Sequence, residues 1–172
     1  MKHPLADQVT KKELIELLGK CWMTHDGMWF YNTLMESGIE KANKINKAAM
    51  KSLAPIEIGR LKKKVGIEEI TTYASFRQFF SKVSELMIPE FMNLSVEFPG
   101  KGVVTWEFNE RNCFAYNGIR MLGVIDAYEC GPLYRIKCWL ETLGIQYRME
   151  PDIHKCVMPE KGRCAGRFVL QF

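Results

Sequence analysis

The hydrophobic period of this chain changes at Pro89, and that change limits the folds open to it. Before Pro89, apolar residues recur at three- and four-residue steps, the spacing of one helical face. After it, MNLSVEF and VVTWEFN are rich in strand-forming residues and flank Pro99-Gly100-Lys101-Gly102, which is typical of a hairpin turn. The pattern predicts an α+β protein whose N-terminal helices pack on an antiparallel β-sheet.

Three helices are expected in the helical part of the chain, residues 11–88. They run from Lys11 to about Ser37, from Glu40 to Val65 with a bend or restart at Pro55, and from Tyr73 to Met87. Thr10 and Glu13 make a capping box before the first helix, and glycines suit the ends of the first two, at Gly38 and Gly66. The first two helices should form a helical hairpin.

Residues 90–172 are expected to hold the sheet and one further helix. Beyond the hairpin, the sequence predicts a strand at Cys113–Tyr116, a helix from Gly131 to Leu143, and strands at Ile145–Glu150 and Ala165–Phe172. Residues 118–129 fit either a helix or a strand. A chain of 172 residues with 47% apolar content can bury one sizeable core, and it contains no repeat or linker. We therefore expect a single domain over residues 1–172.

The composition limits which cellular compartment and which kinds of partner we expect. Charged residues interrupt the N-terminal segment where a signal peptide needs an apolar run, and no stretch is long and apolar enough to span a membrane. We expect a soluble, cytoplasmic protein, in which six cysteines indicate metal binding, catalysis or packing before disulfides. A net charge of +4 is too small to imply a polyanionic partner.

Four cysteines in the last third of the chain are the strongest candidates for a site: Cys113, Cys130, Cys156 and Cys164. Thiolates from separate loops can complete a tetrahedral zinc site, although the short C-x2-C spacing is absent. Three interpretations stay open: a metal site, with zinc favoured over iron; a metal-free pocket or thiol chemistry; and ordinary packing. Cys138, in the middle of the predicted Gly131–Leu143 helix, fits packing better than ligation.

Cys130 stands at the predicted N-terminus of that helix, where free backbone N–H groups and the helix dipole stabilise a thiolate. It is the best candidate for a reactive or ligating sulfur. Cys156 and Cys164 are expected to face one another across the polar turn of residues 157–163.

The segment WMTHDGMWF, residues 22–30, concentrates aromatic and titratable side chains within the first helix. His25 shares a helical stripe with Cys21 and Trp29, so we expect it to face the core. Two interpretations stay open: a hydrogen-bonded core histidine, or a pocket in which His25 and Asp26 do proton chemistry and Trp22 and Trp29 hold a ligand. Gly27 hints at close packing against the helix backbone.

Basic residues from Lys41 to Lys64 fit a solvated helix face better than a nucleic-acid surface, because no aromatic residues are interleaved with them. The sequence contains no phosphate-binding loop, dinucleotide fingerprint or nucleophile elbow. We therefore expect no nucleotide cofactor.

The segments CWMTHDGMWF and GIEKANKINKAAMKSLAPIEIGRLKKKVGI, followed by the cysteines, resemble an uncharacterised group of small prokaryotic cytosolic proteins. More distantly, the ending of the chain is similar to that of vinyl-reductase-like ligand-binding domains and of 2-amino-thiazoline-4-carboxylate hydrolases, in the order Glu150, Cys156, Gly162, Cys164 and Phe168. The second resemblance implies a ligand-binding fold or a hydrolytic activity.

The sequence therefore predicts a cytoplasmic protein that binds a metal or a small molecule. In a hydrolase-like version, metal-bound water or the Cys130 thiolate attacks the substrate and His25 passes the proton. The alternative is a non-catalytic ligand-binding or sensor module with an aromatic pocket. A membrane partner is not expected, nucleic acid is disfavoured, and homo-oligomerisation is left open.

Overall fold

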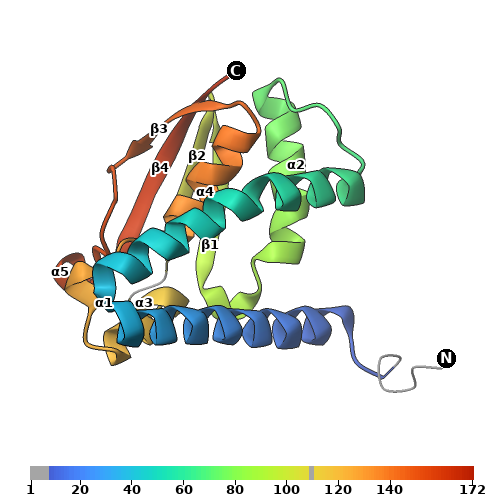
Figure 1. Cartoon of the computed structure of the whole chain (residues 1–172). Helices are drawn as coiled ribbons and strands as arrows, with labels where there is room; N and C mark the ends of the chain where they lie inside the picture. Colours follow the sequence, from blue (N-terminus) through green and yellow to red (C-terminus); the bar gives the residue numbers. More distant parts are fainter. Residues whose placement is uncertain (1–7, 109–110) are drawn as a thin grey trace.

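The computed structural model describes residues 8–108 and 111–172. It has the predicted α+β class: long N-terminal helices, a four-stranded antiparallel sheet, and further short helices in the C-terminal half (Figure 1). Strands β1 (Leu94–Gly100), β2 (Val103–Phe108), β3 (Gln146–Glu150) and β4 (Cys164–Gln171) lie in the order β1-β2-β4-β3.

Helix α1 (Lys11–Val65) consists of two halves joined at Gly38, whose backbone is non-helical with φ of 76°. The capping box at Thr10 and Glu13 and the left-handed cap at Gly66 are both present, as predicted. The two halves open as a V from Gly38 (Figure 1). The expected restart at Pro55 is wrong, because the second half runs through Pro55 without losing helical backbone angles.

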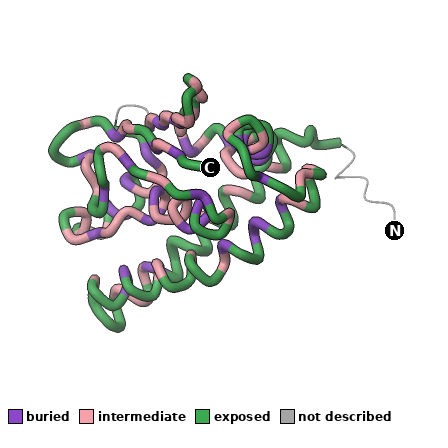
Figure 2. Tube along the Cα trace, turned by 90° about the horizontal axis from the view of Figure 1, so that it is seen from above, coloured by how far each residue is buried: buried purple, intermediate pink, exposed green. Residues whose placement is uncertain are grey.

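Helices α2 (Tyr73–Met87) and α4 (Gly131–Thr142) cover one face of the sheet. The ring of Phe80 on α2 lies 6.1 Å from Phe98 on β1 and 6.2 Å from Trp139 on α4, so these elements share one core. The second half of α1 packs against the outside of α4. Buried residues gather where the helices meet the sheet, and exposed residues line the peripheral helices (Figure 2).

The connection between β2 and α4 differs from the prediction. Residues 113–116, assigned to a strand, instead open helix α3 (Phe114–Met121), which is followed by the short helix η2 (Ile125–Ala127). Phe114, Gly118 and Leu122 recur at four-residue steps and line the interior, a helical and not a two-residue period. Two further short helices complete the described chain, η1 (Glu90–Met92) and α5 (Met158–Lys161).

Two buried polar side chains on the second half of α1 bind it to the C-terminal half of the chain. Asn43 donates to the carbonyl of Ala127 (2.9 Å) and accepts from the N–H of Glu129 (3.2 Å). Glu57 pairs with Arg135 and accepts from the indole of Trp139. These contacts fix α1 relative to α4 and hold open the space between the V and the sheet.

Candidate functional site

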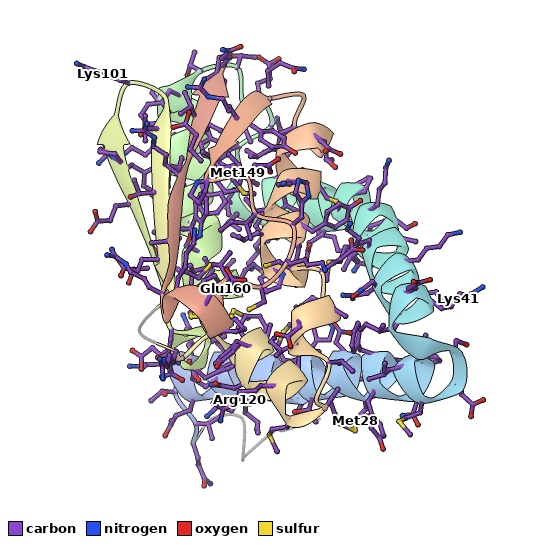
Figure 3. The ribbon with its side chains drawn as sticks, turned by 90° about the vertical axis from the view of Figure 1, so that its left-hand side faces the viewer. Met28, Lys41, Lys101, Arg120, Met149 and Glu160 are labelled. Carbon is purple, nitrogen blue, oxygen red and sulfur yellow. The ribbon has the colours of Figure 1, made fainter. Side chains whose placement is uncertain are left out.

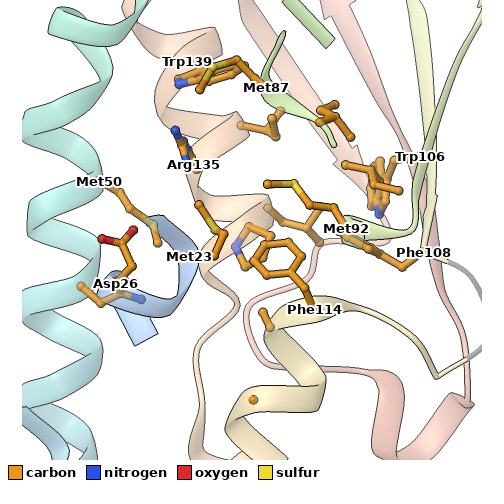
Figure 4. A pocket seen from close by; sticks show the side chains of 18 of the residues that line it. Met23, Asp26, Met50, Met87, Met92, Trp106, Phe108, Phe114, Arg135 and Trp139 are labelled. Carbon is orange, nitrogen blue, oxygen red and sulfur yellow. The ribbon is translucent and has the colours of Figure 1, made fainter. Parts of the chain in front are cut away.

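A cavity of about 510 Å³ lies between the first half of α1, helices α2, α3 and α4, and the sheet. Its wall is mostly apolar, with rings from every layer: Phe76, Phe80, Trp106, Phe108, Phe114 and Trp139. Figure 4 shows Trp106, Phe108, Phe114 and Trp139 around one space. Pockets for small organic ligands have this size and this predominantly apolar lining.

Half of the ten methionines in the chain line this cavity: Met23, Met28, Met50, Met87 and Met92. Methionine is unbranched and polarisable, so a wall rich in it adapts its shape to different apolar ligands. Met50 and Met92 lie on opposite sides of the space, on α1 and beside the sheet (Figure 4).

The charged groups of the cavity lie on its α1 and α4 side, away from the sheet (Figure 4). Arg135 donates from Nε to Glu57 (3.2 Å), and its guanidinium lies 4.9 Å from the Trp22 ring and 5.6 Å from the Trp139 ring. Partial burial raises the pKa of Asp26, and the Arg135 guanidinium opposes that rise. The cavity is thus amphipathic, with one charged side.

Trp106 is a second polar feature of the wall. Its ring packs 4.8 Å from Phe168, and its buried Nε1 has no hydrogen-bond partner in the described parts of the chain. Burial raises the pKa of the Cys164 thiol and the Trp106 side chain partly opposes this rise, so the indole N–H lies beside Cys164 without a hydrogen bond of normal geometry. Buried donors normally find partners, so this N–H is available to a ligand acceptor.

Two glycines leave room at the cavity wall. Neither Gly27 on α1 nor Gly118 on α3 has any atom within 4 Å of the point where a β-carbon would stand. The expected close packing at Gly27 is therefore wrong, because the missing side chain faces open space.

The prediction that His25 faces the core is also wrong. His25 and Trp29 are exposed, and the Trp29 indole donates to His25 Nε2 (3.1 Å) on the outer side of α1. The inner side carries Met23, Gly27 and Phe30 instead. Of the residues predicted in this segment, Asp26 lines the cavity, and the ring of Trp22 contacts the cavity residue Arg135. His25 and Trp29 lie on the side of α1 that faces away from the cavity.

The four cysteines come together through backbone contacts between distant segments. The N–H of Cys130 donates to the carbonyl of His154 (2.8 Å), which brings Cys130 beside Cys156. The N–H of Arg111 donates to Gly162 (3.2 Å), which brings Cys113 close to Cys164. Burial is the main cause of the raised pKa of Cys130, and the nearby thiols of Cys164, Cys113 and Cys156 add to it.

These thiols are protonated at neutral pH. Burial raises the pKa of Cys130 to about 12 and that of Cys164 to about 11, and raises the pKa of Cys113 and Cys156 as well. The sequence predicted a stabilised thiolate at Cys130, which requires a lowered pKa, but the pKa of Cys130 is raised. Cys130 is the N-cap of α4 as expected, and the N–H of Leu133 does lower its pKa, but loss of hydration outweighs this effect.

Within residues 8–108 and 111–172, no three His, Cys, Asp or Glu side chains are arranged to hold a metal ion. Metal binding by the cysteines would require their side chains to move toward one another and lose their protons. Cys138 is buried in α4, in agreement with a packing role.

Comparison with known families adds one finding. Residues 6–88 match a "Family of unknown function (DUF6125)". The match covers α1 and α2, so the chain is similar to DUF6125 in its N-terminal half. The DUF6125 segment contains α1 and α2 and ends before β1, so it supplies only part of the cavity wall. No curated protein and no solved structure matched the chain. The match agrees in part with the expected resemblance to an uncharacterised family, over residues 6–88, and the two more distant resemblances stay predictions.

Several residues of the site were not predicted from the sequence. Leu133, Ile136, Trp139 and Leu140 form an apolar stripe on α4, and Arg135 stands at its edge. The sequence signal that could have marked Arg135 is a charged residue beside an apolar helical stripe, because a charge in that position needs an acidic partner.

No helix in the described residues is both long and apolar enough to cross a membrane.

Proposed function

We propose that this protein is a non-catalytic module that binds an amphipathic small molecule in its central cavity. The cavity of about 510 Å³ carries the proposal, because its size and its predominantly apolar lining are those of pockets for small organic ligands. An apolar portion of the ligand would lie against the rings on β2 and α2. A polar end would lie near Asp26 and Arg135, or accept from Trp106 Nε1.

Two of the three predicted catalytic residues, His25 and Cys130, favour binding over hydrolysis by their placement, and Asp26 is the one that lines the cavity. His25 is on the outer side of α1, opposite the cavity, and the Cys130 thiol holds its proton well above neutral pH. Neither residue is then available as a base or a nucleophile for a molecule inside the cavity. The six free cysteines are in keeping with the proposed cytoplasmic location.

Titration with an apolar fluorophore such as anilinonaphthalene sulfonate tests the proposal. Binding in the cavity should raise the probe's fluorescence and quench that of Trp106 and Trp139, with one site per chain. Solvent extraction of purified protein, followed by mass spectrometry, would show any ligand carried through purification. Absence of saturable probe binding and of any extracted ligand would rule out the proposal.

A second candidate function, zinc binding, rests on the gathering of four thiols from separate segments. Soft thiolates suit zinc, and an indole N–H beside Cys164 could donate to a metal-bound sulfur. Such a site would stabilise the floor of the cavity, because Phe108 and Phe114 lie next to the cysteine-bearing segments. Metal analysis, described below, tests it separately from ligand binding.

A further inference from the structure

The first half of α1 is apolar on two opposite sides. One side faces the cavity, and the other carries the outer stripe: Leu14, Leu18, Cys21, His25 and Trp29, with Trp22 and Met28 at its two edges, where Trp22 reaches Arg135 and Met28 reaches the cavity. These residues recur at three- and four-residue steps and all are exposed, and Leu17 and Met35 extend the stripe on one flank. Met28 projects from α1 away from the sheet (Figure 3).

The large apolar side chains of the outer stripe and its flank are between 38% and 67% exposed. At about 200 Å² for a large side chain, they leave on the order of 700 Å² uncovered. Patches larger than a few hundred Å² mark interaction surfaces, and a standard stable interface buries about 800 Å² on each partner. An amphipathic helix normally buries its apolar side against another surface, so a second apolar side calls for a second partner.

We infer that the outer stripe is a homodimer interface, in which the first half of α1 packs antiparallel against the same helix of a second copy. The stripe from Leu14 to Met35 is about 33 Å long, at 1.5 Å per residue. Such a pairing is isologous and closes with two-fold symmetry, the commonest arrangement of soluble oligomers.

Charge favours the antiparallel direction. Lys11 and Glu36 lie at opposite ends of the stripe, and both are exposed. With His25 on the two-fold axis, antiparallel packing brings Lys11 within about one helical turn of Glu36 of the partner subunit. A parallel pair would place like charges together at both ends.

The charge of the helix also argues against a lipid surface as the partner that covers the outer stripe. Residues 11–37 carry three lysines and four acidic residues. A helix that lies in a membrane interface needs a basic polar face to attract anionic lipid. A second copy of this chain matches the stripe in length, in apolar character and in charge.

Sedimentation velocity of the full chain at micromolar concentration tests this inference. The wild type should be a dimer, and Leu18→Glu with Trp29→Glu should be a monomer with unchanged circular dichroism. Each buried charge should weaken association about 30-fold or more, the effect of removing a hot-spot residue. Ile56→Glu is the matched control, because Ile56 is 53% exposed on the other half of α1 and should leave the dimer intact.

Cysteine cross-linking tests the direction. In a Cys21→Ser background, His25→Cys should form a disulfide-linked dimer under oxidation, whereas Glu36→Cys should not. Cross-linking through Glu36→Cys instead would overturn the antiparallel arrangement. A monomeric wild type, or a dimer insensitive to the two glutamates, would overturn the interface itself. Co-sedimentation of a monomeric wild type with phosphatidylserine vesicles would assign the stripe to a membrane instead.

Discussion

Glu57 accepts a hydrogen bond from the indole Nε1 of Trp139 at 2.7 Å, across 82 positions of sequence. The same carboxylate pairs with Arg135, whose guanidinium lies between the rings of Trp22 and Trp139. One buried acid on α1 therefore satisfies two donors on α4 and fixes the wall of the cavity. The stability of the fold and the shape of the site are thus linked through Glu57.

Replacement of Glu57 by Ala should destabilise the protein by about 3 to 5 kcal/mol, because it leaves a buried guanidinium without its partner. Urea denaturation followed by circular dichroism measures this change. Glu107→Ala removes the exposed pair with Arg163 and should cost less than about 1 kcal/mol. Equal effects of the two variants would contradict the assigned role of Glu57.

Replacing either of two glycines in the cavity wall by leucine should fill part of the cavity and weaken ligand binding without loss of stability. Gly27→Leu and Gly118→Leu should each weaken probe binding at least about tenfold, while the melting temperature holds or rises because leucine favours helix over glycine. Gly59→Leu is the matched control, since Gly59 is helical with open surroundings and lies outside the cavity wall. Unchanged probe affinity in the two cavity variants would place the probe elsewhere.

Alkylation should distinguish the exposed cysteine from the buried ones. With iodoacetamide at pH 8, Cys21 should react and Cys130 should not, because Cys21 is exposed, whereas Cys130 is half-buried and its raised pKa leaves almost no thiolate. Peptide mass spectrometry of native protein gives the extent at each site. Rapid modification of Cys130 would restore it as a candidate nucleophile.

Stability should fall in alkaline solution because of the buried thiols. The pKa of Cys130 is about 12 in the fold against an ordinary 9.0, so below pH 9.0 both folded and unfolded chains hold the proton. Above pH 9.0 the unfolded chain releases it first, and the free energy of unfolding decreases by up to about 1.4 kcal/mol per pH unit. Cys130→Ala should reduce this slope relative to wild type, whereas Cys21→Ser, at an exposed position, should retain it.

Zinc binding predicts about one metal ion per chain in protein purified without a metal-affinity tag, lost in a Cys156→Ser, Cys164→Ser variant. Affinity should rise with pH, because each ligating thiol must release a proton that burial holds tightly. Plasma mass spectrometry measures the metal content. Metal-free protein that also fails to take up added zinc at pH 8 would leave the thiols as packing residues.

The sequence by itself determined where most elements begin and end. Thr10, Gly38 and Gly66 mark helix ends through local capping and left-handed backbone, and Gly100 to Gly102 forms a hairpin turn, because these signals act within a few residues. It also predicted that the four cysteines converge, from their positions at element edges.

Only the tertiary structure decided which side of the first half of α1 is buried. The helix has apolar residues on both sides, so its periodicity favours neither, and the choice came from packing against α3, α4 and the sheet. The cavity likewise joins residues from eight elements, and the protonation of Cys130 reflects burial that overrides its helix N-terminus. Capping and turns are local effects, whereas burial and ionisation depend on neighbours that folding brings from far along the chain.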